Sequence, residues 1–215
     1  MKLLKTGITG LDEMLRGGLP PGVLLVAGEP GSATEVFAQQ VAYNRAQQAS
    51  VSYLTLNKSV ERVRQNMLGF GWDTTKLEGS GSWRFISVPA EQLGDAVEGE
   101  MRESRSIVVD SLSDALYGGE VLDVVDLLRG MSRQNTRVQE LHLALITKGM
   151  HEPEAEVAAQ HFADGVVDFT VNQGPEYVTR KMFIKKIGGA VAPMRNITYV
   201  VGERGITIET ALRIT

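Results

Sequence analysis

Residues Val23 to Gln40 read V-L-L-V-A-G-E-P-G-S-A-T-E-V-F-A-Q-Q, which is an apolar run, a glycine-rich turn and then a helical pattern. An apolar run without polar alternation is typical of a strand that is buried on both faces of a parallel sheet. Where such a strand passes through a glycine turn into a helix, backbone N–H groups and the positive end of the helix can hold a phosphate. This stretch therefore predicts a strand, a loop of the phosphate-binding type and a helix.

The general pattern of such loops is G-x-x-x-x-G-K-[ST]. Gly28 fits the first glycine of the pattern. The places of the second glycine, the lysine and the hydroxyl residue hold Ala33, Thr34 and Glu35. All three positions that carry the chemistry of the loop therefore depart from the pattern.

Each departure has a physical consequence for a bound polyphosphate. Ala33 adds a Cβ where the backbone commonly needs glycine, so the loop is either strained or differently shaped. Thr34 lacks the ammonium that would neutralise phosphate, and Glu35 puts a carboxylate where a hydroxyl would hold magnesium. At an effective dielectric of about 20, like charges about 4 Å apart repel by on the order of 4 kcal/mol. This repulsion is large enough to abolish ordinary nucleotide affinity.

The composition favours one soluble α/β domain over residues 1–215. A chain of 215 residues with 43% hydrophobic and 22% charged residues has room for a full core. It has no cysteine, which excludes disulfides, thiolate metal sites and cysteine nucleophiles. We find no signal peptide and no run that could span a bilayer, so we expect a cytoplasmic protein without a membrane partner. A net charge of −4 gives no general attraction to nucleic acid.

Strands and helices are expected to alternate through the first three quarters of the chain, which implies βαβ crossovers and a mainly parallel sheet. The expected strands are 23–27, 51–56, 85–88, 106–110 and 141–147. The expected helices are 34–48, 60–70, 90–103, 121–131 and 154–162. Before them, Leu11, Met14 and Leu15 predict a short helix, with Thr9 and Asp12 spaced as a capping box.

The alternation of strands and helices ends after Gly165. Residues 166–171, 177–187, 195–201 and 206–210 follow one another as strands, joined by glycine-containing turns. We therefore expect an antiparallel extension at the end of the sheet. The three histidines, His142, His151 and His161, show no metal-ligand spacing and are expected to be surface or hydrogen-bonded residues.

Several segments together resemble a KaiC-like domain of the RecA superfamily, which has the P-loop NTPase fold. The resemblance covers nearly the whole chain and rests on the following runs: Thr6-Gly7-Ile8-x-Gly10-Leu11-Asp12, Gly17-Gly18-Leu19-Pro20-x-Gly22, Gly28-Glu29-Pro30-Gly31, Phe70-Gly71-Trp72-Asp73, Val108-Val109-Asp110-Ser111-Leu112 and Ala163-Asp164-Gly165-Val166. It implies a RecA-like ATPase core, a site shared between neighbouring subunits, and often a ring of six or a filament.

The chain departs from this family at positions that take part in ATP hydrolysis in the family. KaiC-like ATPases end the second strand with a pair of glutamates that activate water, but this chain has Asn57 and Lys58 there. The family's late Lys-x-Arg-Gly run is Lys185-Lys186-Ile187-Gly188 here, so Lys185 is kept and Ile187 stands in place of the arginine. Asp110 remains at the place that would hold the water shell of magnesium. The predicted remnant of a nucleotide site comprises Gly28, Gly31, Ser32, Ala33, Thr34, Glu35, Asp110 and Lys185.

RecA relatives that bind DNA use loops after the middle strands. The corresponding segments 113–120 and 148–154 are expected here to be short, acidic loops, which disfavours contact with phosphates. We therefore expect no nucleic-acid partner.

These departures favour a catalytically degenerate KaiC-like protein without a required cofactor. We expect it to act by protein–protein interaction in regulation or signal transduction, with an active paralogue as one candidate partner. The alternative is an ATP-binding protein with weak or partner-dependent ATPase activity, in which Lys58 or Lys185 replaces the loop lysine. Two further alternatives are a structural subunit that lends Lys185 to the site of an active neighbour, and a metal site formed by Glu35 and Asp110 without nucleotide.

Overall fold

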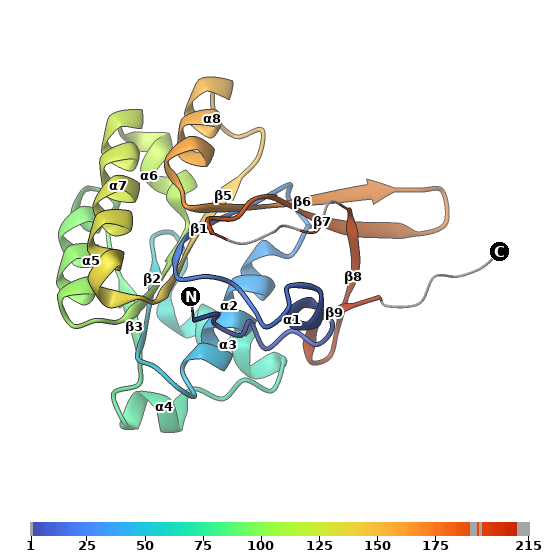
Figure 1. Ribbon diagram of the computed structural model, residues 1–215, viewed down its shortest axis with the longest axis horizontal. Coiled ribbons are helices and arrows are strands. Elements are labelled where there is room, and N and C mark those ends of the chain that lie inside the picture. Colours follow the sequence, from blue (N-terminus) through green and yellow to red (C-terminus); the bar gives the residue numbers. More distant parts are fainter. Residues whose placement is uncertain (1, 190–192, 194, 210–215) are drawn as a thin grey trace.

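The computed structural model describes residues 2–189, 193 and 195–209. These residues form three layers, in which one twisted sheet lies between two sets of helices (Figure 1). The strands of the sheet are ordered β3-β2-β4-β5-β1-β6-β7-β8-β9. The mainly parallel α/β sheet expected from the sequence is thereby confirmed.

The parallel part of the sheet supplies the edge on which the candidate site is built. Its strands are β1 (Gly22–Gly28), β2 (Val51–Thr55), β3 (Trp83–Ser87), β4 (Ser106–Asp110), β5 (Leu141–Thr147) and β6 (Gly165–Gln173). The strands β7 (Val178–Lys186), β8 (Ile197–Gly202) and β9 (Gly205–Ile208) pair antiparallel beyond β6, as expected. Residue 210, the last of the strand expected at 206–210, lies outside the described residues.

The helices divide between the two faces of the sheet (Figure 1). One face carries α1 (Leu11–Met14), α2 (Thr34–Arg45), α3 (Val60–Gly69) and α4 (Thr75–Gly79). The other face carries the 3-10 turn η1 (Ala90–Gln92) and the helices α5 (Leu93–Arg102), α6 (Leu112–Gly118), α7 (Val121–Val138) and α8 (Pro153–Phe162).

Strand β1 is buried along its whole length because helices cover it on both faces. Leu24 and Val26 point into the core under α2, and Val23, Leu25 and Ala27 point into the core under α7 and α8. The apolar run that opens the sequence analysis is therefore the shared wall of two hydrophobic cores.

Several expected element bounds need correction. The segment 113–120 was expected to be a loop, but most of it belongs to helix α6, and α4 was not expected at all. Helix α7 runs to Val138 rather than 131, because its buried stripe continues through Leu128 and Met131 to Asn135. The expected helix 90–103 is η1 followed by α5, and the helix expected to reach residue 48 ends at Arg45.

The expected capping box of the first helix is wrong. Its N-cap is Gly10, without a capping side chain. The carboxylate of Asp12 instead accepts hydrogen bonds from the backbone N–H and hydroxyl of Thr6, at 2.8 and 2.7 Å, and from the N–H of Gly7 at 3.0 Å. Asp12 therefore fastens the segment before the helix rather than the helix itself.

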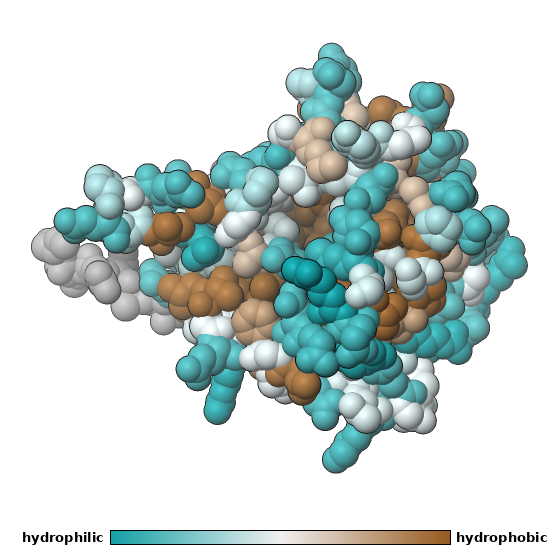
Figure 2. Space-filling view, turned by 180° about the vertical axis from the view of Figure 1, so that it is seen from behind, coloured by the Kyte–Doolittle hydropathy of each residue, from teal (hydrophilic) through white to brown (hydrophobic). Residues whose placement is uncertain are grey.

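Seen from behind, hydrophobic residues form several separate groups among hydrophilic ones (Figure 2). Within the described part of the chain, no helix combines the length and the apolar character that crossing a bilayer requires.

Candidate functional site

The candidate site lies at the edge of the sheet where parallel strands end. Gly28, Thr55 and Asp110 are the last residues of β1, β2 and β4, and Thr55 pairs with Asp110 across the sheet. In open α/β sheets, ligands bind at this carboxyl edge. The sequence thus brings the glycine loop, the end of the second strand and the surviving carboxylate to one edge.

The glycine loop after β1 closes on itself. The backbone N–H of Ser32 donates to the carbonyl of Glu29 at 3.0 Å, and the Ser32 hydroxyl donates to the same carbonyl at 2.6 Å. Pro30 at the second position and Gly31 with φ 83° at the third are typical of a type II turn. Both donor groups of Ser32 are therefore engaged within the loop.

Ala33 adopts the backbone conformation for which glycine is usual. Its φ of 59° and ψ of 37° lie in the left-handed region, where a Cβ is strained. Gly28 also needs the absence of a side chain, since a Cβ there would lie 2.3 Å from Cγ2 of Thr34 and 2.5 Å from Oγ of Ser32. Ala33 therefore takes a left-handed conformation in spite of its Cβ, and Gly28 stands where no side chain fits.

Side chains of the antiparallel extension hold the loop's carbonyl groups. The Nε of Arg180 on β7 donates to the carbonyl of Gly31 at 3.1 Å, and the hydroxyl of Tyr199 on β8 donates to that of Ser32. Burial raises the pKa of Tyr199, which keeps this hydroxyl protonated as a donor. These two hydrogen bonds hold the loop against strands β7 and β8.

The start of α2 carries donor groups and one negative charge. Within the described residues, the backbone N–H groups of Ala33 and Thr34 donate no hydrogen bond to the chain. Such N–H groups at a helix start can bind an anion. Glu35 lies in the first turn of α2, and its negative charge opposes the binding of a polyphosphate there.

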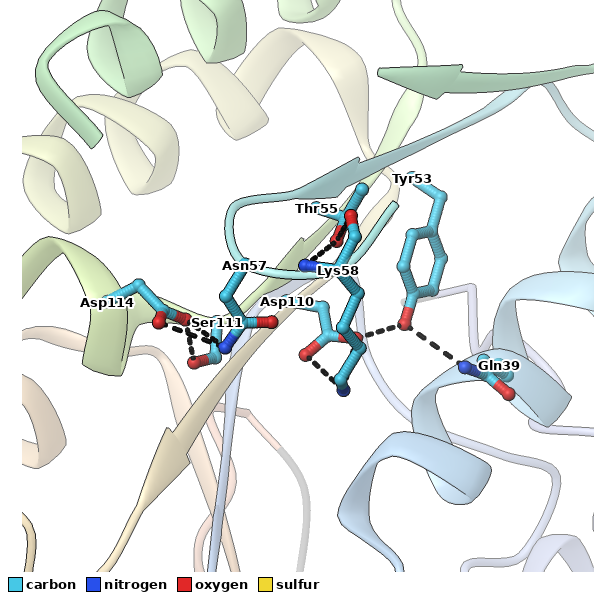
Figure 3. Close-up of polar contacts among 8 residues, drawn as sticks. All are labelled: Gln39, Tyr53, Thr55, Asn57, Lys58, Asp110, Ser111 and Asp114. Atoms are coloured by element: carbon cyan, nitrogen blue, oxygen red, sulfur yellow. Dashed lines mark hydrogen bonds and ion pairs between the residues drawn. The ribbon is translucent and has the colours of Figure 1, made fainter. Parts of the chain in front are cut away.

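Asp110 is paired with a cation from its own chain. The Nζ of Lys58 lies 3.3 Å from Oδ2 and 3.5 Å from Oδ1 of Asp110, whose surface is only 3% exposed (Figure 3). The hydroxyl of Tyr53 donates to Oδ2 at 2.7 Å and accepts a longer bond, 3.4 Å, from Nε2 of Gln39. Burial raises the pKa of Tyr53, and Asp110 raises it further, so the hydroxyl stays a donor.

The two residues in place of the family's glutamates both turn to carboxylates. The amide of Asn57 donates to both carboxylate oxygens of Asp114 at the start of α6, at 2.9 and 3.0 Å (Figure 3). The hydroxyl of Thr55 donates to the carbonyl of Lys58 at 2.9 Å and accepts from its N–H at 3.3 Å. This closed turn directs the side chain of Lys58 back to Asp110.

A second ion cluster lies beside the loop. Asp168 on β6 accepts from Nζ of Lys148 at Oδ1 and from Nζ of Lys185 at Oδ2, each at 2.6 Å. The Nζ of Lys148 also lies 3.9 Å from Oε1 of Glu29 in the loop. Two ammonium groups that face the candidate site are therefore neutralised by carboxylates of the same chain.

Comparison with known proteins identifies the family. A family model described as "ATPase: KaiC" matches residues 4–213. The chain belongs to the KaiC family. A UPF0273 protein of Saccharolobus solfataricus is 32% identical to this KaiC-family chain over 97% of the chain and 83% of the relative.

Other relatives agree with this assignment. A UPF0273 protein of Pyrococcus furiosus is 26% identical, over 97% of this chain and 94% of the relative. The circadian clock protein KaiC3 of Synechocystis is 40% identical over 43% of this chain and 18% of its own length. The crystal structure of a KaiC-like protein of Pyrococcus horikoshii superposes with a TM-score of 0.83 at 20% identity, covering 97% of this chain and 99% of that one. This last likeness shows the fold.

The predicted site residues fall into two places in this KaiC-family chain. One is the loop and the start of α2, which contain Gly28, Gly31, Ser32, Ala33, Thr34 and Glu35. Asp110 lies at the end of β4 and contacts Lys58, while Lys185 on β7 contacts Asp168. Lys186, the next residue, points elsewhere and donates to the carbonyls of His161 and Ala163 at 2.8 and 2.6 Å.

Sequence reasoning missed Tyr53, Lys148 and Asp168. Asp168 stands in the otherwise apolar run Gly165-Val-Val-Asp-Phe169, and a carboxylate there needs a cation to be buried. That signal indicates a partner but does not say which lysine. Tyr53 gave no comparable signal, because a tyrosine in an apolar strand fits a core position as well.

The described residues contain no cluster of histidine, aspartate and glutamate suited to holding a metal. Such a cluster comprises at least three side chains, so the pair of Glu35 and Asp110, proposed as metal ligands in one alternative, stays a prediction. His142 is fully buried and hydrogen-bonded: its Nδ1 accepts from the N–H of Ile107 at 3.2 Å, and its Nε2 lies 3.0 Å from Oδ1 of Asn135.

Proposed function

We propose that this chain is a KaiC-family domain that has lost ATP hydrolysis and acts by binding other proteins in regulation or signal transduction. The observation that carries the proposal is the ion pair between Lys58 and Asp110. It replaces two parts of an ATPase site at once. Lys58 stands in place of a carboxylate base. Its ammonium pairs with Asp110, the carboxylate that would hold the water shell of magnesium.

The charges of the loop support the same conclusion. Thr34 and Glu35 supply no cation and no metal-binding hydroxyl, and Lys148 and Lys185 are bound by Asp168. A triphosphate on this loop would meet the carboxylate of Glu35 without a lysine from the loop to balance it. We therefore assign no catalytic residue and no required cofactor.

The test is calorimetric titration with Mg-ATP together with a phosphate-release assay on the pure protein. We expect neither turnover nor binding in the low-micromolar range. The double variant Thr34→Lys, Glu35→Thr restores the loop's charge, and it should gain affinity if charge is what prevents binding. Low-micromolar affinity with phosphate release in the unmodified protein contradicts the proposal.

A second candidate function is ATP binding with weak or partner-dependent hydrolysis. It is favoured by the N–H groups of Ala33 and Thr34, which remain free to bind an anion. In this case Lys58 would have to leave Asp110 to reach the phosphate. Substitution Lys58→Ala then lowers ATP affinity, whereas under the leading proposal there is no affinity for it to lower.

Family membership also supports self-association, and the resemblance suggests a ring of six or a filament. We also propose that the protein works in the cytoplasm. An active paralogue is one candidate partner. The side chain of Lys185 is 41% exposed although it binds Asp168, so it remains a candidate to reach a neighbour's site in a mixed ring. Copurification with a KaiC relative whose loop is intact favours this arrangement, and a strictly homomeric assembly in cells argues against it.

A further inference from the structure

A groove runs between α5 and α7, which pack side by side on the face of the sheet that α2 does not cover (Figure 1). Its volume is about 720 Å³. Gly118 and Gly119, at the end of α6, line it as well. The groove belongs to none of the ion clusters of the candidate site.

The dimensions of the groove match a short helix. Its lining residues run from 90 to 101 on one side and from 123 to 134 on the other. At 1.5 Å per residue, each side is roughly 16 Å long, which corresponds to about three helical turns. The floor is apolar, with Val97 and Met101 facing Val124 and Met131.

Exposed hydrophobic side chains lie beside the groove where α6 meets α7. Tyr117 is 79% exposed and Leu122 is 70% exposed, and the chain between them contains the lining residues Gly118 and Gly119. Exposed large apolar side chains next to a groove are typical of a protein-binding surface.

The rim of the groove is strongly acidic. The segments 90–101 and 123–134, which form its two sides, together contain six carboxylates and two basic residues, Arg129 and Arg133. The lining residues themselves include Glu91, Glu98, Asp123 and Asp126 and no basic residue. A partner with surplus lysine or arginine is therefore favoured.

Only part of this charge is neutralised within the chain. Glu98 pairs with Arg102 at 2.6 Å, and Asp126 pairs with Arg129 at 3.6 Å. Glu100 pairs with Arg84 at 3.3 Å and with Arg105 at 3.2 Å. Glu91 and Asp123 take part in none of the ion pairs found among the described residues. The negative charge along the groove is thus available to a partner.

Two helical glycines line the groove on opposite sides. Among the described residues, apart from the chain neighbours and the backbone of the same helix, no atom lies within 4 Å of the place where a Cβ of Gly94 on α5 or Gly130 on α7 would stand. Glycine weakens a helix, and here the packing of the chain does not require it. The missing side chains do, however, let the backbone of another helix approach closely.

We infer that this groove binds an amphipathic helix of a partner protein, about three turns long, with an apolar stripe facing the floor and lysines or arginines facing the acidic rim. The inference rests on the proposed protein-binding function and names its surface. A second copy of the chain is the less suitable occupant, because it has a net charge of −4.

The probe is a fluorescently labelled synthetic helix of about 15 residues, with leucines at helical spacing and lysines on its flanks. Its binding to the full chain is followed by fluorescence polarisation. A scrambled peptide of the same composition keeps the charge and loses the stripe. We expect micromolar binding of the designed helix that weakens as salt is added, and at least tenfold weaker binding of the scrambled peptide.

Two substitutions block the groove without crowding the chain itself. Gly94→Leu and Gly130→Leu each place a side chain in open space, and each should reduce binding about tenfold while the thermal melting temperature is kept or raised. The matched control is Gly99→Leu, since Gly99 also lies open on α5 but does not line the groove. It should leave binding unchanged.

Three results overturn the inference: equal binding of the scrambled peptide, unchanged binding by both blocking variants, or a wild-type dimer that Gly130→Leu converts to a monomer. The last result would assign the groove to a second copy. Phosphate release from Mg-ATP, measured on the same samples, tests the proposed loss of catalysis separately and does not affect the peptide result.

Discussion

At the scale of single residues, a substitution of Lys58 measures how much the ion pair with Asp110 contributes to stability. Asp110 is 3% exposed, and a buried carboxylate without a cation is costly. The Lys58 side chain is 34% exposed, which reduces the energy of the pair. We predict that Lys58→Met lowers the free energy of unfolding by about 1–2 kcal/mol in urea denaturation.

A double-mutant cycle separates the pair from the packing of the lysine chain. Adding Asp110→Asn to Lys58→Met removes the carboxylate that lacks a partner, so the double variant should lose less than the sum of the two single losses. Strict additivity of the two losses would show that Lys58 and Asp110 are not coupled.

Ala33 offers a second prediction, of opposite sign. An L-residue in the left-handed region costs about 1–2 kcal/mol, and glycine removes this strain. Part of the gain is lost because glycine gives the unfolded chain more conformational freedom. Ala33→Gly should therefore raise the free energy of unfolding by about 0.5–1 kcal/mol. The control is Ala158→Gly inside α8, which should lower it by about 1 kcal/mol. Destabilisation by both substitutions would mean that Ala33 is not strained.

The residues of the site could be predicted in part. The charge changes at Thr34 and Glu35 are visible in the sequence, and so is the unusual conformation that a glycine position requires of Ala33. The partner of Lys58 was not predictable, because it depends on the turn closed by the Thr55 hydroxyl. Which lysines reach Asp168 depends on three separate elements meeting at one edge.

At the scale of elements, His142 joins β4, β5 and α7. Its ring accepts from the backbone of Ile107 on β4 and contacts Asn135 on α7. Asn135 in turn donates to the carbonyl of Glu140 at 2.9 Å and accepts from its N–H at 3.0 Å. A neutral imidazole therefore holds the end of α7 against the sheet.

This arrangement predicts a pH dependence. Burial lowers the pKa of His142 to about 3, well below its ordinary value of 6.5. Between these values the unfolded chain binds a proton that the folded chain does not, so stability falls as pH drops from 6.5 toward 3, by up to about 1.4 kcal/mol per pH unit. Urea denaturation at several pH values should give a shallower slope for His142→Gln. Equal slopes would exclude His142 as the cause.

Gln40 fastens the last strand of the sheet to α2. Its side chain donates to the carbonyl of Ile206 on β9 at 3.2 Å and accepts from the N–H of Ile206 at 2.7 Å. Gln40→Met keeps the shape but leaves both buried backbone groups without partners, and should cost about 2–3 kcal/mol in urea denaturation. Gln47→Met, at an exposed glutamine, should change stability by less than about 0.5 kcal/mol.

The elements were predictable where their pattern is long. The run of β1 and the buried stripe of α7 are clear, although the helix continues seven residues past the expected end at 131, to Val138. Short elements gave too few residues for a period, which is why the five-residue α4 was missed and α6 was expected to be a loop. His142 and Gln40 make contacts between distant elements that no local pattern contains.

At the scale of the whole molecule, the three lysines of the candidate site pair with carboxylates of their own chain. Lys58, Lys148 and Lys185 each contact a carboxylate of the same chain. In a RecA-type ring, by contrast, bound nucleotide joins neighbouring subunits. Assembly of this protein should therefore not depend on nucleotide, whatever its oligomeric state.

The last prediction follows from this balance. Light scattering should give the same mass with and without Mg-ATP. A ligand at 1 mM with a dissociation constant above about 1 mM stabilises by less than about 0.4 kcal/mol, which shifts the melting temperature of a chain this long by less than about 2 °C. A site with a dissociation constant of about 10 μM would add about 2.7 kcal/mol and a shift of roughly 5–10 °C. A KaiC relative with an intact loop serves as the positive control. A shift of that size here, or a nucleotide-dependent mass, would show that the loop holds nucleotide despite Glu35.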